Sequence, residues 1–238
     1  MASAPLQKRN HQPLLWIIDL GSNKGYPYTR DLQLSLVQAR RKNCIPDILL
    51  LVEHNPVFTM GRHGKWENLL VDKKVLQEKG ISCIPIERGG DITFHGPGQL
   101  IGYTILKVTG KGIKVKALVR NIENTILQIL AQSGIEGRRN MNNPGVWVDE
   151  AKIAAIGLAI KYGVSFHGFA LNVDMDLTPF SWIHPCGLQH IPVISMKDLK
   201  PDNIDVSVIK ERLILSFCSC FGYRYIRLQP HHLKNLDV

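Results

Sequence analysis

The chain has 238 residues, of which 45% are hydrophobic and 21% are charged, and its formal net charge is +9. This is the composition of an ordinary soluble globular protein, and its length allows a sizeable buried core. The longest apolar runs, such as residues 48–52, are far too short to span a bilayer, so we expect no membrane segment.

The basic balance suits an acidic partner, although it also fits a solvated surface that keeps the protein soluble. Nucleic acid is not an expected partner, because the chain has no zinc-finger spacing, no aromatic RNA-binding motif and no long basic helix. The five cysteines are scattered and form no CxxC pair, which favours a reducing compartment. Residues 1–13 lack the apolar core of a signal peptide, so we expect a cytoplasmic protein.

Along the chain, apolar periodicity and turn residues predict alternating strands and helices. The predicted strands are 14–20, 47–52, 81–86, 92–94, 100–108, 146–148, 152–160, 164–173 and 223–228. The predicted helices are 30–42, 71–79, a helix from 115 that Gly134 ends, and 206–221. Residues 177–199 show no regular pattern.

Short turns join most of these strands, and only a few helices intervene. The pattern predicts an α/β (α+β) fold with a mixed, largely antiparallel sheet covered by helices. No linker-like composition divides the chain, so we expect a single domain over residues 1–238, in which residues 1–13 form a flexible segment.

The stretch RGGDITFHGPGQL, residues 88–100, places a short strand between two glycine-rich ends. Glycine allows positive φ and lets a ligand approach the backbone closely. The stretch therefore reads either as a wall of a substrate pocket, with Arg88 and His95 as polar anchors, or as a hairpin with unusual turns. It is not a phosphate loop, because neither GxxxxGK[ST] nor GxGxxG after a strand is present.

Cys186 lies between Pro185 and Gly187 in the patternless segment, which suits a nucleophile at a loop tip as well as a structural cysteine. A thiol needs a nearby cation or base to form its thiolate at neutral pH. Lys152 begins an uncharged apolar run, where partial desolvation would fit it for proton transfer, although an exposed hairpin lysine is the simpler reading. His184, Cys186 and His190 could instead bind a metal, but their spacing matches no standard zinc site.

Four separated motifs resemble one family. RGGDITFHGPGQL (88–100), PGVWVDEAKIAAIG (144–157), SFHGFALNVDMDLTPF (165–180) and IHPCGL (183–188) are similar to the lipoyl(octanoyl) transferases of the LipB type. PVFTMGRHG (56–64) resembles the same family, and the similarity runs from about residue 14 to about residue 200 in the family's order.

The resemblance implies an acyltransferase that moves an octanoyl group from acyl carrier protein to a lysine of lipoyl domains, the first step of endogenous protein lipoylation. It implies as acceptors the lipoyl domains of 2-oxoacid dehydrogenases and the glycine cleavage H protein, and as fold the catalytic module of biotin and lipoate ligases. By resemblance, Cys186 forms a thioester intermediate, and Lys152 lowers the pKa of that cysteine and shuttles the proton. No cofactor and no metal are expected.

The resemblance also assigns substrate contacts. These fall on Arg88, Gly89, Gly90, Asp91, Ile92, Thr93, Phe94 and His95, on Ala155, Ile156 and Gly157, and on Gly168, Phe169 and Ala170. A geometric expectation follows from this assignment: His95 should lie within reach of Cys186.

Three alternatives stay open at this stage. An ATP-dependent lipoate or biotin ligase has the same fold but needs no cysteine nucleophile, which Cys186 argues against. A non-catalytic protein that binds an acidic carrier domain would show binding without turnover. A metallohydrolase would carry a metal.

Overall fold

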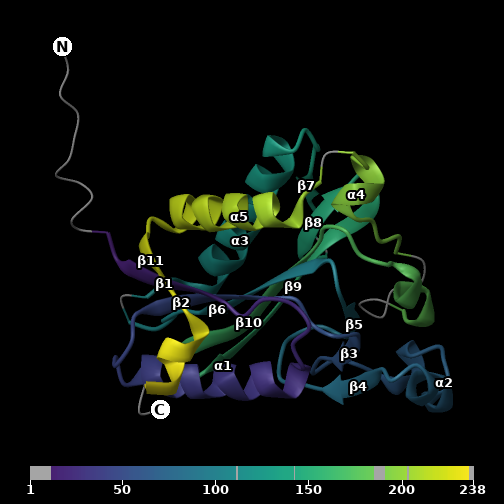
Figure 1. Ribbon diagram of the computed structural model, residues 1–238, viewed down its shortest axis with the longest axis horizontal. Helices are drawn as coiled ribbons and strands as arrows, with labels where there is room; N and C mark the ends of the chain where they lie inside the picture. Colours follow the sequence, from purple (N-terminus) through teal and green to yellow (C-terminus); the bar gives the residue numbers. More distant parts are fainter. Residues whose placement is uncertain (1–11, 111, 142, 185–190, 203, 236–238) are drawn as a thin grey trace.

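The computed structural model describes residues 12–110, 112–141, 143–184, 191–202 and 204–235. Within these ranges the chain forms an eight-stranded sheet and a three-stranded sheet, with helices on both faces of the larger one (Figure 1). The predicted α/β fold with a mixed sheet is confirmed.

The strands of the large sheet follow the order β11-β1-β2-β6-β10-β9-β8-β7. Their bounds are β1 Leu14–Asp19, β2 Asp47–Val52, β6 Gln99–Ile105, β7 Arg138–Arg139, β8 Gly145–Val148, β9 Ala151–Lys161, β10 Val164–Asn172 and β11 Arg224–Leu228. β1 is parallel to both β2 and β11, and every other neighbouring pair is antiparallel. The sheet is therefore largely antiparallel, as predicted.

The small sheet has the order β4-β3-β5 and lies beside one end of the large sheet (Figure 1). It consists of β3 Val57–Met60, β4 Ser82–Pro85 and β5 Ile92–His95, with β4 parallel and β5 antiparallel to β3. The hairpin reading of residues 88–100 is wrong, because β5 pairs with β3 in this sheet while β6 pairs with β2 and β10 in the large one. The segment between β5 and β6 crosses from one sheet to the other.

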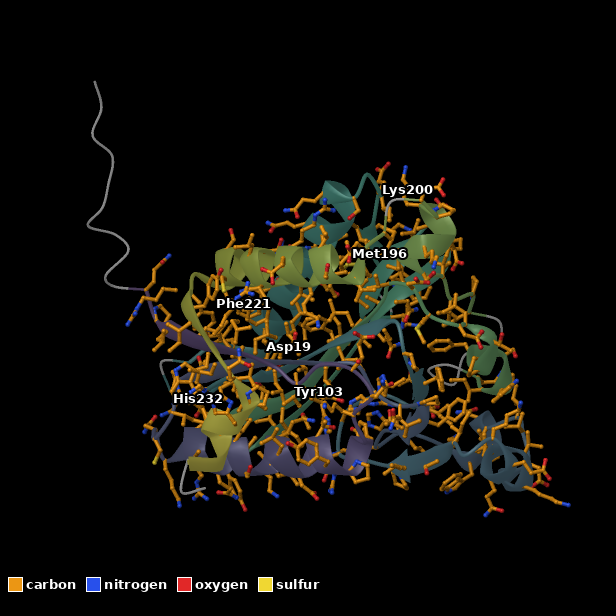
Figure 2. All side chains as sticks on the ribbon, viewed as in Figure 1. Asp19, Tyr103, Met196, Lys200, Phe221 and His232 are labelled. Carbon is orange, nitrogen blue, oxygen red and sulfur yellow. The ribbon has the colours of Figure 1, made fainter. Side chains whose placement is uncertain are left out.

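Helices cover the two faces of the large sheet. The α-helices are α1 Tyr26–Arg41, α2 Lys73–Glu78, α3 Val115–Gln132, α4 Met196–Leu199 and α5 Val206–Phe221, of which α2 lies beside the small sheet (Figure 1). Short 3₁₀ turns are η2 Trp66–Asn68, η3 Thr178–Trp182 and η5 Pro230–Asn235. α3 and α5 lie on one face and α1 lies on the other (Figure 1). Side chains fill the layer between the sheet and each set of helices (Figure 2).

Two segments differ from the sequence prediction for identifiable reasons. α1 begins at Tyr26 and not at residue 30, because Gly25 takes the N-cap position and Pro27 lies in the first turn, where its missing N–H costs nothing. The segment 177–199 also contains η3 and α4, and α4 begins with a capping box between Ser195 and Asp198. These turns are too short to leave an apolar period in the sequence.

Among the helices of the described residues, none combines the length and the apolar character that crossing a bilayer requires.

Candidate functional site

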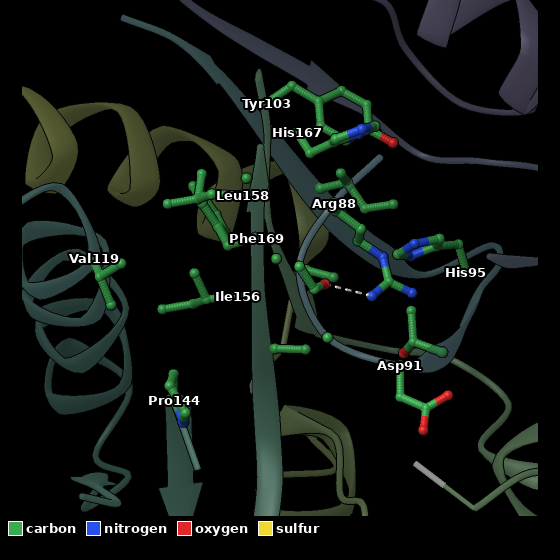
Figure 3. Close-up of a pocket in the computed structure, with 18 of the residues that line it drawn as sticks. Arg88, Asp91, His95, Tyr103, Val119, Pro144, Ile156, Leu158, His167 and Phe169 are labelled. Atoms are coloured by element: carbon green, nitrogen blue, oxygen red, sulfur yellow. Dashed lines mark hydrogen bonds between the residues drawn. The ribbon is translucent and has the colours of Figure 1, made fainter. Parts of the chain in front are cut away.

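A cavity of about 370 Å³ lies around β9 and β10, beside the Arg88–His95 stretch (Figure 3). This volume falls in the range of roughly 300–1,000 Å³ that is typical of small-molecule sites. The residues predicted to contact substrate line it with one exception: Arg88, Gly89, Gly90, Asp91, Ile92, Thr93, His95, Ala155, Ile156, Gly157, Gly168, Phe169 and Ala170. Lys152 lines it too.

The exception is Phe94. It is not among the residues that line the cavity, and its ring packs against Phe58 and Phe180, with ring centroids 5.1 and 5.9 Å apart. Strand alternation accounts for this, because successive side chains of β5 point to opposite faces of the small sheet.

Small residues form the part of the cavity wall that the large sheet supplies. In the pairing of β9 with β10, Gly157 lies opposite Gly168 and Ala155 lies opposite Ala170. A Cβ atom at Gly157 would lie 2.8 Å from Cδ of Arg88, so the arginine side chain fits here only because residue 157 has no side chain. The four small residues therefore leave room both for Arg88 and for a slender ligand.

Arg88 holds the glycine-rich stretch against the small sheet. Its side chain is 8% exposed, and its guanidinium donates to the Thr59 carbonyl at 2.6 Å, to the Thr59 hydroxyl at 3.1 Å and to the Gly89 carbonyl at 3.0 Å. On the other side, the Gly89 N–H donates to the Leu158 carbonyl of β9 at 2.9 Å. The stretch thus bridges the two sheets and forms one side of the cavity.

Asp91 is buried but its carboxylate is already occupied. It accepts hydrogen bonds from the Ile92 N–H at 2.6 Å, from the Lys65 N–H at 3.3 Å and from the Asn68 side chain. Through these contacts, Asp91 holds the loop around residues 61–68 in place.

His95 is buried and neutral. Its Nδ1 lies 2.8 Å from Oε1 of Gln99 and its Nε2 lies 3.2 Å from the Thr59 hydroxyl. Because the amide oxygen only accepts, Nδ1 carries the proton and Nε2 accepts from the hydroxyl. Burial, together with the nearby His54, lowers the pKa of His95 from 6.5 to about 3.

His167 is a cavity residue that the sequence analysis left out of the site. It has φ of 56° in the middle of β10, a left-handed conformation that costs a residue other than glycine about 1–3 kcal/mol. This turn of the backbone places its ring beside that of Phe166, with centroids 4.6 Å apart. A hydrogen bond from its N–H to Oε1 of Gln33 at 2.8 Å accompanies this conformation, and strained residues of this kind are common at functional sites.

The His167 ring is 2% exposed and meets polar groups on two sides. Its Nδ1 lies 3.4 Å from the Tyr26 hydroxyl, and its Nε2 lies 3.6 Å from the Glu87 carboxylate. Burial lowers the pKa of His167 to about 4, although the Glu87 carboxylate opposes this shift. Arg30 forms an ion pair with Glu87 and lowers the pKa of that carboxyl. At the end of the cavity next to Tyr103, the His167 ring is therefore polar but neutral (Figure 3).

Lys152 is 6% exposed, so its ammonium lies inside the protein and not on the hairpin surface. Its Nζ donates to Oδ1 of Asn143 at 2.6 Å and lies 5.0 Å from the centre of the Trp147 ring. The reading of Lys152 as an exposed hairpin residue is wrong. Asn143 also lines the cavity, and no pattern in the sequence predicts its contact with Lys152.

Cys186 and His190 lie outside the described residues. The expected contact between His95 and Cys186 therefore lies outside them too. The two described segments that flank Cys186 are anchored beside the cavity. The His184 N–H donates to the Asn68 carbonyl at 2.8 Å, and the Lys152 N–H donates to the Pro192 carbonyl at 2.8 Å.

Across the described part of the chain, no cluster of three or more His, Cys, Asp or Glu side chains is placed to hold a metal ion. A second hollow, of about 720 Å³, lies around Asp47, Lys107 and Tyr223, and none of the residues predicted to form the site lines it. The predicted residues thus converge on the first cavity.

Comparison with known proteins shows which proteins the chain resembles. The chain is 46% identical over 211 residues to an octanoyltransferase of Dictyoglomus thermophilum, covering 88% of each chain. It is 40% identical to an octanoyltransferase of Desulfotalea psychrophila, covering 92% of this chain and 99% of the relative.

Among solved structures, a bipartite lipoate protein ligase from Thermoplasma acidophilum shares the fold. Its TM-score is 0.68 at 17% identity, and the match covers 93% of this chain and 90% of the ligase chain. The sequence model of the lipoyl protein ligase A/B catalytic domain matches residues 26–218, which include the small sheet, the cavity and Lys152. The chain belongs to the lipoyl protein ligase A/B catalytic domain family.

Proposed function

We propose that this protein transfers an octanoyl group from acyl carrier protein to a lysine of lipoyl domains, through a thioester on Cys186. The observation that carries the proposal is the cavity that brings the buried Lys152 together with the glycine-rich Arg88–His95 stretch and the small-residue wall of β9 and β10. Relatives at 38–46% identity named octanoyltransferases support acyl transfer as the reaction.

The cavity suits an acyl chain. Apolar and small residues of the large sheet line it, with Ile156 and Phe169 on the face toward α3 and Ala170 on the opposite face (Figure 3). A flexible, unbranched chain needs such a slot and few polar partners, because its binding energy comes from removing apolar surface from water. The polar end beside His167 sets a limit on how far the chain extends.

The reaction has two halves. In the first, Cys186 passes its proton to the amine of Lys152, and the thiolate attacks the thioester carbonyl carbon of the donor. The carbon–sulfur bond to the carrier breaks, and Lys152 returns the proton to the departing thiolate. One thioester is exchanged for another of similar energy, so no energy source is needed.

In the second half, the amine of the acceptor lysine attacks the Cys186 thioester. The amine nitrogen loses a proton to Lys152, the carbon–sulfur bond breaks, and Cys186 leaves as a thiolate that regains the proton. The product is an amide. The burial of Lys152 supports this role, because a desolvated lysine gives up its proton more readily than an exposed one.

Net charge supports the choice of partners. The excess of Lys and Arg over Asp and Glu, 29 to 20, favours encounter with acidic carrier domains. The proposed location is the cytoplasm, where acyl carrier protein and lipoyl domains would both be available to it.

Intact-protein mass spectrometry tests the proposal. After incubation with octanoyl-acyl carrier protein, the wild type should gain one octanoyl group, and Cys186→Ser should not. Absence of an adduct on the wild type, or an undiminished adduct on Cys186→Ser, contradicts the thioester.

Two further measurements separate this function from the alternatives. Transfer to a lipoyl domain should proceed without ATP, whereas a ligase would require it. Lys152→Ala should slow acylation at neutral pH while leaving the fold intact, and an unchanged rate would remove Lys152 from the mechanism.

A further inference from the structure

The side chain of Asn143 bridges Lys152 and the cavity. Its carbonyl oxygen accepts a hydrogen bond from Nζ of Lys152 at 2.6 Å, and Asn143 and the adjacent Pro144 both line the cavity. Trp147 lies on another side of the ammonium, 5.0 Å from Nζ to the ring centre. The Lys152 ammonium group thus contacts both an amide and an aromatic ring.

This contact fixes which end of the Asn143 amide faces which way. The oxygen and nitrogen of an asparagine amide are normally assigned from their hydrogen bonds. An ammonium group has three donors and no acceptor, so the atom that meets it must be the amide oxygen. The Nδ2 group therefore points away from Lys152, at the other end of the same small amide.

The Nδ2 group is buried, and it has no hydrogen-bond acceptor among the residues that the structure describes. A buried donor without a partner costs about 1–3 kcal/mol, which is why proteins pair nearly all of them. Such a donor in the wall of a cavity, next to the proposed proton carrier, is placed to pair with an acceptor of a bound substrate.

The backbone holds this amide rigidly. The Asn143 N–H donates to Oδ1 of Asn140 at 3.2 Å, and the indole N–H of Trp147 donates to the Asn143 carbonyl at 3.2 Å. Pro144 restricts the backbone of the residue before it. A donor fixed in advance is what stabilises a developing negative charge, because it need not reorganise during the reaction.

We propose that Asn143 is a catalytic residue whose Nδ2–H donates to the acyl carbonyl oxygen as that oxygen becomes an oxyanion. This inference rests on the acyl transfer proposed above. When the thiolate sulfur bonds to the carbonyl carbon, the π electron pair moves onto oxygen, where Nδ2–H stabilises it. The pair then re-forms the C=O bond as the bond to the carrier sulfur breaks, and Lys152 gives that sulfur its proton.

The amide therefore has two functions at one place. Its oxygen positions Lys152 next to the leaving sulfur, and its N–H group polarises the carbonyl. Because the two groups belong to one planar amide, the proton donor and the oxyanion lie next to each other in the transition state.

Single-turnover acylation of the full-length protein by octanoyl-acyl carrier protein, followed by mass spectrometry over pH 6 to 10, separates these functions. Asn143→Asp keeps an oxygen for Lys152 and removes the N–H donor, whereas Asn143→Ala removes both. Asn124→Asp is the matched control, since Asn124 lies on α3, bonded to Arg139 and outside the cavity lining. The melting temperature of each variant shows that it folds.

Removing an oxyanion donor lowers the rate by roughly 100- to 1,000-fold, so both Asn143 variants should lose at least about 100-fold, while Asn124→Asp acylates like the wild type. The new carboxylate of Asn143→Asp also raises the pKa of Lys152, which would move the rate profile to higher pH. The loss through the missing donor instead persists on the high-pH plateau.

An Asn143→Asp plateau equal to that of the wild type overturns the donor role, as does an Asn143→Ala variant that acylates at the wild-type rate. Either result would leave the proposed function intact if the wild type still forms the Cys186 adduct. If the wild type forms no adduct, the proposed function itself fails.

Discussion

Three buried histidines beside the cavity make this protein sensitive to acid well above the range in which carboxylates titrate. Burial lowers the pKa of His54 and of His167 to about 4 and that of His95 to about 3, from an ordinary value of 6.5. Folding therefore favours the neutral imidazoles. Their contribution to stability is complete above the unfolded pKa of 6.5 and is lost as the pH falls toward the folded values.

Burial is the main reason why the pKa of His54 is low, and the hydrogen bond to the Lys24 carbonyl opposes this shift. Its Nδ1 donates to the Lys24 carbonyl at 2.9 Å, so its Nε2 must accept from the Tyr103 hydroxyl at 2.7 Å. A proton on Nε2 would leave two donors facing each other unless the buried Tyr103 hydroxyl turned away from its acceptor.

The size of the effect follows from linkage. Between pH 7 and pH 5, a histidine that titrates at 6.5 unfolded and at about 4 folded lowers the free energy of unfolding by about 2 kcal/mol. With His95 and His167 included, and allowing for their mutual interaction, the total is on the order of 5 kcal/mol. That is a large part of the roughly 5–15 kcal/mol by which domains are stable.

Urea unfolding at pH 7, 6 and 5, followed by tryptophan fluorescence, measures this loss. His54→Gln removes one titrating ring, so its unfolding free energy should fall by about 2 kcal/mol less than that of the wild type over the same interval. A wild-type change below about 1 kcal/mol, or equal changes in the two proteins, would refute the reasoning. NMR should likewise show these three imidazoles neutral at pH 5 in the folded protein.

Four substitutions test the packing of two turns and of the cavity wall. Gly98→Ala and Gly80→Ala both place alanine at positive φ, but only at Gly98 would the new Cβ overlap the Asp174 carbonyl. Urea unfolding should show that the free energy of unfolding falls by about 1–2 kcal/mol for Gly80→Ala and by clearly more for Gly98→Ala. Arg88→Lys cannot reproduce the two hydrogen bonds of the guanidinium to Thr59, so it should lower the free energy of unfolding by about 1–3 kcal/mol and also lower kcat/KM. Wild-type melting and turnover in this variant would contradict that role. Gly157→Ala should displace Arg88 and raise KM for the acyl donor, and an unchanged KM would contradict that packing.

The sequence was most informative where local chemistry marks the ends of an element. The predicted helix 206–221 agrees with the structure at both ends, because Asp205 caps its first turn and Gly222 takes the left-handed conformation after its last residue. The turn between β8 and β9 was predicted for the same kind of reason, and Asp149 adopts a positive φ there. Such signals require no knowledge of distant residues.

The pairing of strands and the direction of side chains could not be predicted from such local signals. Nothing local states that β5 pairs with β3 and not with the strand that follows it, because that choice depends on how the two sheets pack. The Asn143 contact with Lys152 arises when a loop folds back onto a strand nine residues away in sequence. The left-handed conformation of His167 is imposed by the strands and the helix around it.

The cavity residues with polar side chains on β9 and β10 owe their direction to two departures from regular strand geometry. The pairing of β8 with β9 passes from Trp147↔Lys152 to Val146↔Ala154, so Ile153 is an extra residue and the strand bulges next to Lys152. On β10, His167 has a positive φ, although its pairing with β9 stays in register. Bulges and strained residues re-aim side chains and cluster at active sites.

Between these two irregularities the ladder from Ala154↔Leu171 to Leu158↔His167 is regular, and it carries the small residues that leave the cavity open. Regular pairing is what a flat wall for an unbranched chain requires, since each small residue must lie opposite another. Lys152 lies beside the bulge and His167 is the strained residue, so the two polar side chains that β9 and β10 contribute to the cavity lie at the two ends of this ladder.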